Sequence, residues 1–110
     1  MAWRTLLVSE AVREIESLAG REREAIENAV KKLQALGPQL GYPHSSAIRG
    51  SEDLRELRPR AGRSRWRVLY RQIGEVYLVA AIGPEAGVDP RGFDRAVAAA
   101  KRRLDELEVD

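Results

Sequence analysis

The sequence predicts one α+β domain with the element order βααβββα, in which the helices lie on one face of a mostly antiparallel sheet. Three observations predict it. A β-rich segment opens the chain, two helical patterns follow, and three segments of strand length precede a well-capped helix. A chain of 110 residues supports one hydrophobic core and is too short for two, so we expect a single domain over residues 1–110.

The first half of the chain contains one strand and two helical segments. Residues 3–8 (WRTLLV) are rich in β-formers and predict the first strand. Ser9 is a suitable N-cap for the helix that follows. Gly20 interrupts the helical periodicity, a second pattern runs over residues 25–36, and Gly37-Pro38 ends it. The pattern favours a helical hairpin, although one long kinked helix fits the same spacing.

The second half predicts a loop, three strands and a helix. Residues 37–53 are dense in Gly, Pro and Ser and predict a loop. Ile73-Gly74 has the length of a two-residue hairpin turn. Asp89 and Pro90 predict the N-cap and first position of the last helix. The predicted strands are residues 54–60, 65–72 and 75–83.

Composition excludes several functional classes and locates the positive charge. The chain has no cysteine, so it holds neither a disulfide nor a thiolate metal site, and no cluster has metal-ligand spacing. Its apolar runs are too short for a signal-peptide core or a membrane span, which predicts a cytoplasmic protein that does not enter membranes. Residues 49–71 hold eight arginines against three acidic residues, a net charge of +5 within a chain of +2. This asymmetry predicts a localised anion-binding surface.

Alternation along the predicted strands places most of these arginines on one face of the sheet. If residues 61–64 form the turn, Arg60 lies opposite Arg65 and Arg58 lies opposite Arg67. The opposite face is apolar and forms the core, with Leu57, Pro59, Trp66, Val68, Tyr70, Tyr77, Val79 and Ala81. The basic face carries Arg58, Arg60, Arg65, Arg67 and Arg71, with Glu56, Leu69, Leu78 and Ala80 among them.

Two interpretations of the basic face stay open. Arginine stems can cover the apolar residues of an ordinary solvated sheet face. Like charges opposite each other are unfavourable, however, and guanidinium groups bind phosphate in a bidentate manner that lysine does not match. We therefore favour a phosphate-binding platform on the open face of the sheet.

Two residues are candidates for proton transfer. His44 is the only histidine and lies in the predicted loop, where it could approach the basic face or stay exposed without a catalytic role. Glu56 lies on the basic face and could act as a base, although pairing with Arg58 or Arg67 is its default role.

The succession LRELRPRAGRSRWRVLYRQIGEVYLVAAI, between a helical hairpin and a capped helix, resembles the RelE/ParE superfamily of type II toxins. It is most similar to the HigB-like, phage-derived (Gp49-like) branch. The resemblance implies a cytoplasmic toxin that a helix-turn-helix antitoxin neutralises. It also implies an endoribonuclease that needs neither metal nor cofactor and cleaves messenger RNA at the ribosome.

The resemblance also implies site residues. Arg58 and Arg67 match the arginines that bind the scissile phosphate, while Arg60, Arg63, Arg65 and Arg71 extend the RNA-binding surface. Where the family usually has an aromatic residue and paired lysines, this chain has Ile82-Gly83-Pro84-Glu85. Three alternatives therefore accompany the ribonuclease: a ParE-like topoisomerase inhibitor, a catalytically inactive nucleic-acid binder, and a protein whose arginines serve only an acidic partner.

Overall fold

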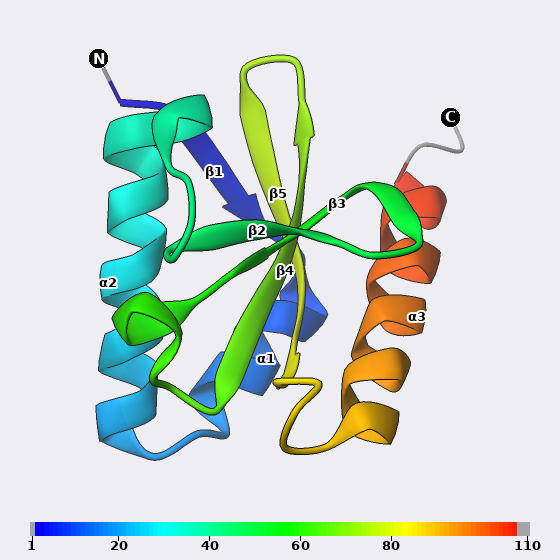
Figure 1. Cartoon of the computed structure of the whole chain (residues 1–110). Helices are drawn as coiled ribbons and strands as arrows, with labels where there is room; N and C mark the ends of the chain where they lie inside the picture. Colours follow the sequence, from blue (N-terminus) through cyan, green and yellow to red (C-terminus); the bar gives the residue numbers. More distant parts are fainter. Residues whose placement is uncertain (1, 108–110) are drawn as a thin grey trace.

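The computed structural model describes residues 2–107, apart from the side chain of Glu52, and confirms the α+β class (Figure 1). Both predicted N-terminal helices form as separate helices, and the three predicted strands form a meander. The elements are β1 (Arg4–Leu7), α1 (Ser9–Glu16), α2 (Gly20–Leu36), η1 (Gly37–Gln39), β2 (Ser45–Ile48), β3 (Ser51–Leu57), η2 (Pro59–Gly62), β4 (Trp66–Ile73), β5 (Val76–Pro84) and α3 (Pro90–Leu107).

One five-stranded sheet has the order β1-β5-β4-β3-β2, with β1 parallel to β5 and the other pairs antiparallel. The predicted register of β3 and β4 is confirmed, since Leu57 pairs with Val68. Between β4 and β5 the turn is shifted by one residue. Ile73 pairs with Val76, so the turn is Gly74-Glu75, and Gly74 supplies the positive φ of 61° that such a tight turn requires.

Strand β2 lies within the segment that we predicted as a loop. It pairs with β3, where Ser45 lies opposite Leu57. Ser45 is fully buried, and its hydroxyl lies 2.6 Å from the hydroxyl of Tyr70. Because a partner on β4 satisfies this polar side chain, a serine-rich segment can join the sheet, which composition alone did not indicate.

Of the two predicted N-cap residues, Asp89 and Ser9, the structure confirms Asp89. The carboxylate of Asp89 accepts a hydrogen bond from the backbone N–H of Gly92 at 2.9 Å and caps α3 as predicted. The prediction for Ser9 is wrong, because Ser9 is already the first residue of α1 and its hydroxyl donates to Glu10. None of the helices within residues 2–107 has the length and apolar character needed to cross a bilayer.

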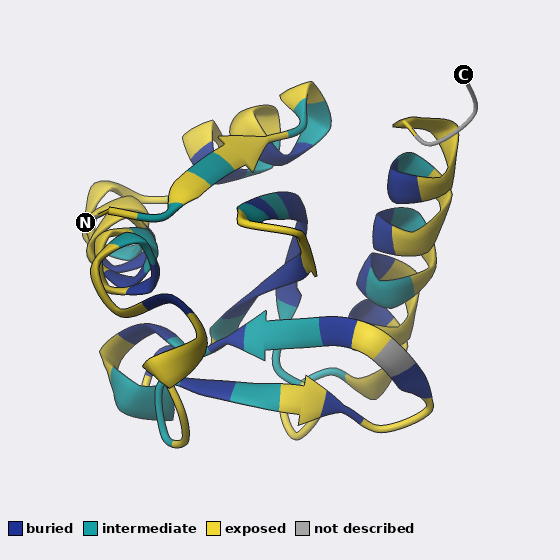
Figure 2. Cartoon of the chain, turned by 90° about the horizontal axis from the view of Figure 1, so that it is seen from above, coloured by how far each residue is buried: buried dark blue, intermediate teal, exposed yellow. Residues whose placement is uncertain are grey.

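The helices cover both faces of the sheet, which corrects the prediction of a single covered face (Figures 1 and 2). Helices α1 and α2 pack on one face, while α3 packs on the other. The first core includes Ile15, Ile26, Leu33, Leu57, Val68, Tyr70, Tyr77, Val79 and Ile82. The second includes Ile48, Leu54, Leu69, Ala80, Ala81, Phe93, Ala96, Ala100 and Leu104.

A bulge in β5 explains part of this difference. Leu69 pairs with Ala81, but the next residue, Tyr70, pairs with Val79, so Ala80 is the extra residue. Beyond the bulge the alternation is reversed. Ala81 therefore packs against α3, whereas Ile82 joins the core beneath α1 and α2. The apolar residues that we placed on an open face are in fact the floor of the α3 interface.

Close packing and one ion pair hold α3 in place. A Cβ added to Gly83 would lie 2.4 Å from the Cβ of Ala96, so the helix backbone approaches β5 only because residue 83 is glycine. Arg103 of α3 donates to both carboxylate oxygens of Glu14, at 3.1 and 3.0 Å, and to the carbonyl of Ala80 at 2.9 Å. The hydrogen bonds that Arg103 donates to the Glu14 carboxylate raise the pKa of Arg103 above its usual value. This contact links α1, the bulge and α3.

Tyr77 provides a prediction about stability and pH. Its side chain is buried, and its hydroxyl has no hydrogen-bond partner among the described residues. Burial, followed by the nearby Tyr70, raises the pKa of Tyr77 above 10.0. The unfolded chain therefore loses this proton first, so the free energy of unfolding is constant below about pH 9 and falls as the pH rises above about 10.

We expect Tyr77→Phe to increase the free energy of unfolding by about 1 kcal/mol, because it removes a buried hydroxyl without a partner. It should also weaken the alkaline loss of stability. Urea unfolding at pH 7 and at pH 10.5 measures both effects. A variant that is less stable at pH 7 would show that this hydroxyl makes a hydrogen bond that stabilises the fold.

Candidate nucleic-acid interface

Arg67 lies in the interior of the protein, so the prediction that it faces an open surface is wrong. Its side chain is only 2% exposed. The guanidinium donates to the backbone carbonyls of Ser64 at 2.7 Å, Trp66 at 2.9 Å and Gly62 at 3.3 Å. These bonds close the connection between β3 and β4. A guanidinium held in this way is a structural element and is inaccessible to a phosphate.

Two carboxylates complete the surroundings of Arg67. Glu85, directly after β5, accepts a hydrogen bond from Nη2 at 2.5 Å, and Glu56 of β3 lies 3.3 Å from Nε. Glu56 also accepts from Nη1 of Arg58 at 3.1 Å. Glu56 therefore has the pairing role predicted as its default, and with both arginines. In place of the lysines that were expected here, Gly83 allows close packing on α3 and Glu85 compensates the charge of Arg67.

The remaining arginines of the predicted platform separate into buried and exposed groups. Arg71 is buried, and its Nε lies 3.0 Å from a carboxylate oxygen of Asp53. Arg60, Arg63 and Arg65 are exposed. Arg60 has a positive φ of 56° in the η2 connection, and the guanidinium of Arg65 lies over the Trp66 ring at 5.5 Å. They lie around a turn and do not form a flat array.

Arg58 is the predicted site residue whose position best suits anion binding. It follows β3 directly, and its side chain is 19% exposed. Nε donates to the carbonyl of Pro43 at 3.0 Å, and the guanidinium carbon lies 5.1 Å from the centre of the Tyr42 ring. A Cβ on Gly62 would come within 2.7 Å of Nη2. Glycine at position 62 thus leaves room for a guanidinium whose Nη2 makes no hydrogen bond to another described residue.

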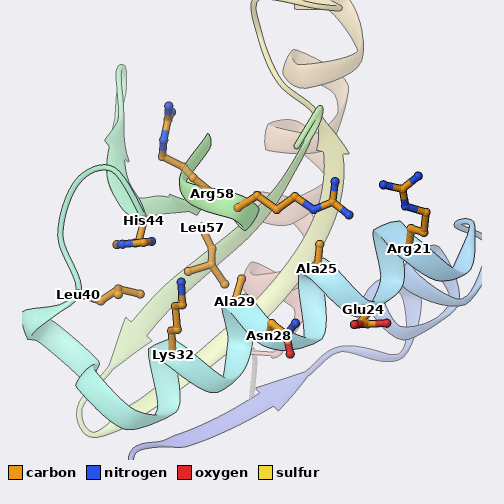
Figure 3. Close-up of a pocket in the computed structure, with 11 residues that line it drawn as sticks. Arg21, Glu24, Ala25, Asn28, Ala29, Lys32, Leu40, His44, Leu57 and Arg58 are labelled. Atoms are coloured by element: carbon orange, nitrogen blue, oxygen red, sulfur yellow. The ribbon is translucent and has the colours of Figure 1, made fainter. Parts of the chain in front are cut away.

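A cavity of about 560 Å³ lies between α2 and the segments that carry Arg58 and His44 (Figure 3). In Figure 3, Lys32 rises from α2 toward the loop of His44, and Arg21 lies at the opposite end of the cavity. We call this cavity the α2 cleft. Its titratable lining residues are Arg21, Glu24, Lys32, His44, Arg58 and Arg60. One carboxylate thus accompanies four permanent cations, so the cleft attracts anions.

The structure brings three of the predicted site residues together in the α2 cleft: Arg58, Arg60 and His44. His44 is half-buried, and its carbonyl accepts a hydrogen bond from the backbone N–H of Arg58 at 2.8 Å. This bond fixes the loop to the end of β3. The remaining predicted residues lie elsewhere, because Arg67 and Arg71 are buried and Arg65 lines a separate depression beside α3.

Sequence reasoning missed the contribution of α2. Arg21, Asn28 and Lys32 line the cleft, with Ala25 and Ala29 between them as small residues that leave space. Arg21, Asn28 and Lys32 are spaced by seven and four residues, which places them on one face of the helix. The sequence therefore does contain this pattern. It cannot be distinguished from ordinary helix-surface charge until the facing loop is known. Among residues 2–107, no group of three His, Asp or Glu side chains could hold a metal ion.

Comparisons with known proteins find a family and solved structures to which this chain is similar. The family described as phage-derived Gp49-like proteins matches residues 13–82. A mutant of the E. coli toxin RelE in the free state has a TM-score of 0.63 at 21% identity, covering 89% of this chain and 97% of that chain. A chain of the intact E. coli RelBE toxin–antitoxin complex has a TM-score of 0.60 at 22% identity, covering 76% of this chain and 98% of that chain.

A third solved structure is the archaeal RelE–RelB complex from Pyrococcus horikoshii OT3, with a TM-score of 0.55 at 21% identity, covering 76% of this chain and 96% of that chain. No curated protein matches the sequence significantly. At these identities the solved structures show a shared RelE-like fold.

Proposed function

Because the chain belongs to the phage-derived Gp49-like family of RelE-related proteins, we propose that it is the toxin of a type II toxin–antitoxin system and that it cleaves messenger RNA. The observation that carries this proposal is the α2 cleft. It combines a fixed arginine, three further cations and the only histidine in one cavity of a RelE-like fold. Such a surface suits a polyanion that carries closely spaced phosphates.

The chemistry that suits the cleft is attack of a deprotonating RNA 2′-hydroxyl on the adjacent phosphate, which breaks the bond to the 5′-oxygen of the next nucleotide. The products are a 2′,3′-cyclic phosphate and a 5′-hydroxyl, which takes up a proton as it leaves. Arg58 is held by Pro43 and Glu56, so its remaining N–H groups are already oriented before RNA binds. Donors fixed in this way stabilise the charge that develops on the phosphate oxygens, often the largest catalytic contribution. Arg60, Arg21 and Lys32 then bind flanking phosphates. Arg67 contributes indirectly, because it positions Glu56.

Proton transfer is proposed for His44. It lines the cleft, and its imidazole makes no hydrogen bond to another described residue, so it is available to substrate. Glu56 was the other candidate, and its carboxylate lies between two arginines. That position suits orientation of Arg58 better than exchange of a proton. The exposed Arg63 and Arg65 extend the RNA path outside the cleft, and the buried Arg71 supports the sheet.

The partners and location follow from the same proposal. RelE proteins with this fold occur in solved complexes with RelB antitoxins. We propose that a helix-turn-helix antitoxin neutralises this chain, that its substrate is messenger RNA on the ribosome, and that it acts in the cytoplasm without metal or cofactor.

A non-ribonuclease toxin of the same fold, such as a topoisomerase inhibitor, is the second candidate. One observation favours it. The residues at positions 83–85 are used for packing against α3 and for pairing with Arg67, so none of these three residues supplies a cation to a phosphate.

Induction of the protein in a bacterial host, with and without the neighbouring reading frame, tests the proposal. The experiment measures growth, and it maps the 5′ ends of cellular messages by primer extension. We expect growth arrest with new message ends, both relieved by the neighbour. Arrest without new ends would overturn the ribonuclease and favour topoisomerase inhibition. Unchanged growth would contradict both functions.

A further inference from the structure

Tyr42 is a highly exposed aromatic residue that contacts an arginine of the α2 cleft. Its side chain is 77% exposed, the largest value among the exposed large apolar residues of the described chain. One side of the ring faces the guanidinium of Arg58 at 5.1 Å, and Arg58 itself lines the cleft. Single exposed apolar residues are common and need no explanation. This ring is different because an arginine of the proposed site lies against it.

The loop that carries Tyr42 is held firmly at its base. The backbone N–H groups of His44 and Ser45 both donate to the carbonyl of Gly41, at 2.9 and 3.1 Å. Pro43 accepts from Arg58, and the buried Ser45 hydroxyl is 2.6 Å from that of Tyr70. An aromatic ring on a fixed support loses little conformational freedom when a flat ligand binds to it.

We propose that Tyr42 is a stacking platform for an unpaired base of single-stranded RNA whose adjacent phosphate lies in the α2 cleft. This inference rests on the proposed function and specifies how its substrate is held. Proteins that bind single strands combine a basic groove with aromatic rings on which bases stack, and every base offers a flat face for such a contact. Arg58 lies on one side of the ring, so the base stacks on the other, and the arginine and the base share one aromatic residue.

The test uses the full chain and an oligouridylate with 2′-O-methyl groups, which cannot be cleaved, and a single 2-aminopurine as the fluorescent base. Tyr42→Ala should weaken binding by roughly 5- to 150-fold, the range expected for one stacked base. Tyr42→Phe should bind like the unchanged protein and keep the quenching of 2-aminopurine, which Tyr42→Ala should lose. Ile73→Ala, at an exposed apolar residue of the β4–β5 hairpin, is the matched control and should change neither.

Salt dependence separates stacking from charge. The slope of the logarithm of affinity against the logarithm of salt concentration should stay the same in Tyr42→Ala, because no phosphate contact is lost. A smaller slope would show that the ring acts only by holding Arg58, and would overturn the proposal. Equal affinity of Tyr42→Ala and the unchanged protein would overturn it too. So would a failure of the unchanged protein to bind the oligoribonucleotide, or tighter binding of the matching deoxyoligonucleotide than of the oligoribonucleotide. Message cleavage in cells decides the proposed function independently of these outcomes.

Discussion

Arg58→Ala should abolish growth arrest and reduce message cleavage by about 10²- to 10³-fold, the range found when one fixed donor to a developing oxyanion is removed. The guanidinium is oriented by Pro43 and Glu56 and borders the α2 cleft, so no neighbouring arginine can replace its geometry. The fold should survive. Glu56 keeps Arg67 as a partner, and the two hydrogen bonds that are lost, to Pro43 and Glu56, cost about 1–2 kcal/mol each. Growth and primer extension measure activity, and thermal unfolding measures stability.

Arg102→Ala provides the matched control for this experiment. It removes the same charge from an exposed position of α3, away from the cleft, and should leave growth arrest and cleavage unchanged. If Arg58→Ala remained fully toxic, Arg58 would have no catalytic part. If both variants lost activity equally, overall charge and not the cleft would be responsible.

Arg67→Ala should lower the free energy of unfolding by about 3–5 kcal/mol, the cost of breaking a buried ion pair from one side. The substitution removes hydrogen bonds to three carbonyls and leaves Glu56 and Glu85 without their shared cation. Such a loss is a large share of the 5–15 kcal/mol typical of a whole domain. Urea unfolding of the purified protein measures it.

Arg63→Ala is the control for Arg67, because it removes the same side chain from an exposed position of the same connection. Its stability should change by no more than about 0.5 kcal/mol. The opposite result for Arg67→Ala, unchanged stability with lost cleavage, would mean that Arg67 binds the substrate and that the structural role assigned to it is wrong.

The sequence predicted the order of the helices and of every strand but β2, and the β3–β4 register, because these depend on local signals. Gly20, Gly37-Pro38 and Asp89 mark helix ends, and alternation fixes which residues of β3 and β4 lie opposite each other. Strand β2 was missed because its hydrogen bonds and the burial of Ser45 depend on β3 and Tyr70. The bulge at Ala80 reverses the alternation of Ala81 and Ile82, so their faces were assigned wrongly. The layer formed by α3 was missed because alternation identifies Leu69, Leu78 and Ala80 as one face but does not show which helix covers it.

The site was predicted in part for the same reason. Arg58 and His44 were identified from residue type, and the structure places both at one cleft. Arg67 looks identical to Arg58 in the sequence, but Glu85, eighteen residues further along the chain, neutralises it in the interior. Lys32 and Arg21 resemble ordinary surface charges until α2 is seen to pack beside the β3–β4 connection. Long-range partners therefore decide which arginines are available to RNA.

The location of the RNA is the central claim, and backbone amide chemical shifts on addition of the uncleavable oligoribonucleotide test it most directly. We expect the largest shifts at residues 41–44 and 58–62 and along the face of α2 that carries Arg21 and Lys32. Shifts concentrated instead around Arg65, Trp66 and α3, with the α2 cleft unaffected, would contradict the account and place the nucleic acid on the other side of the sheet.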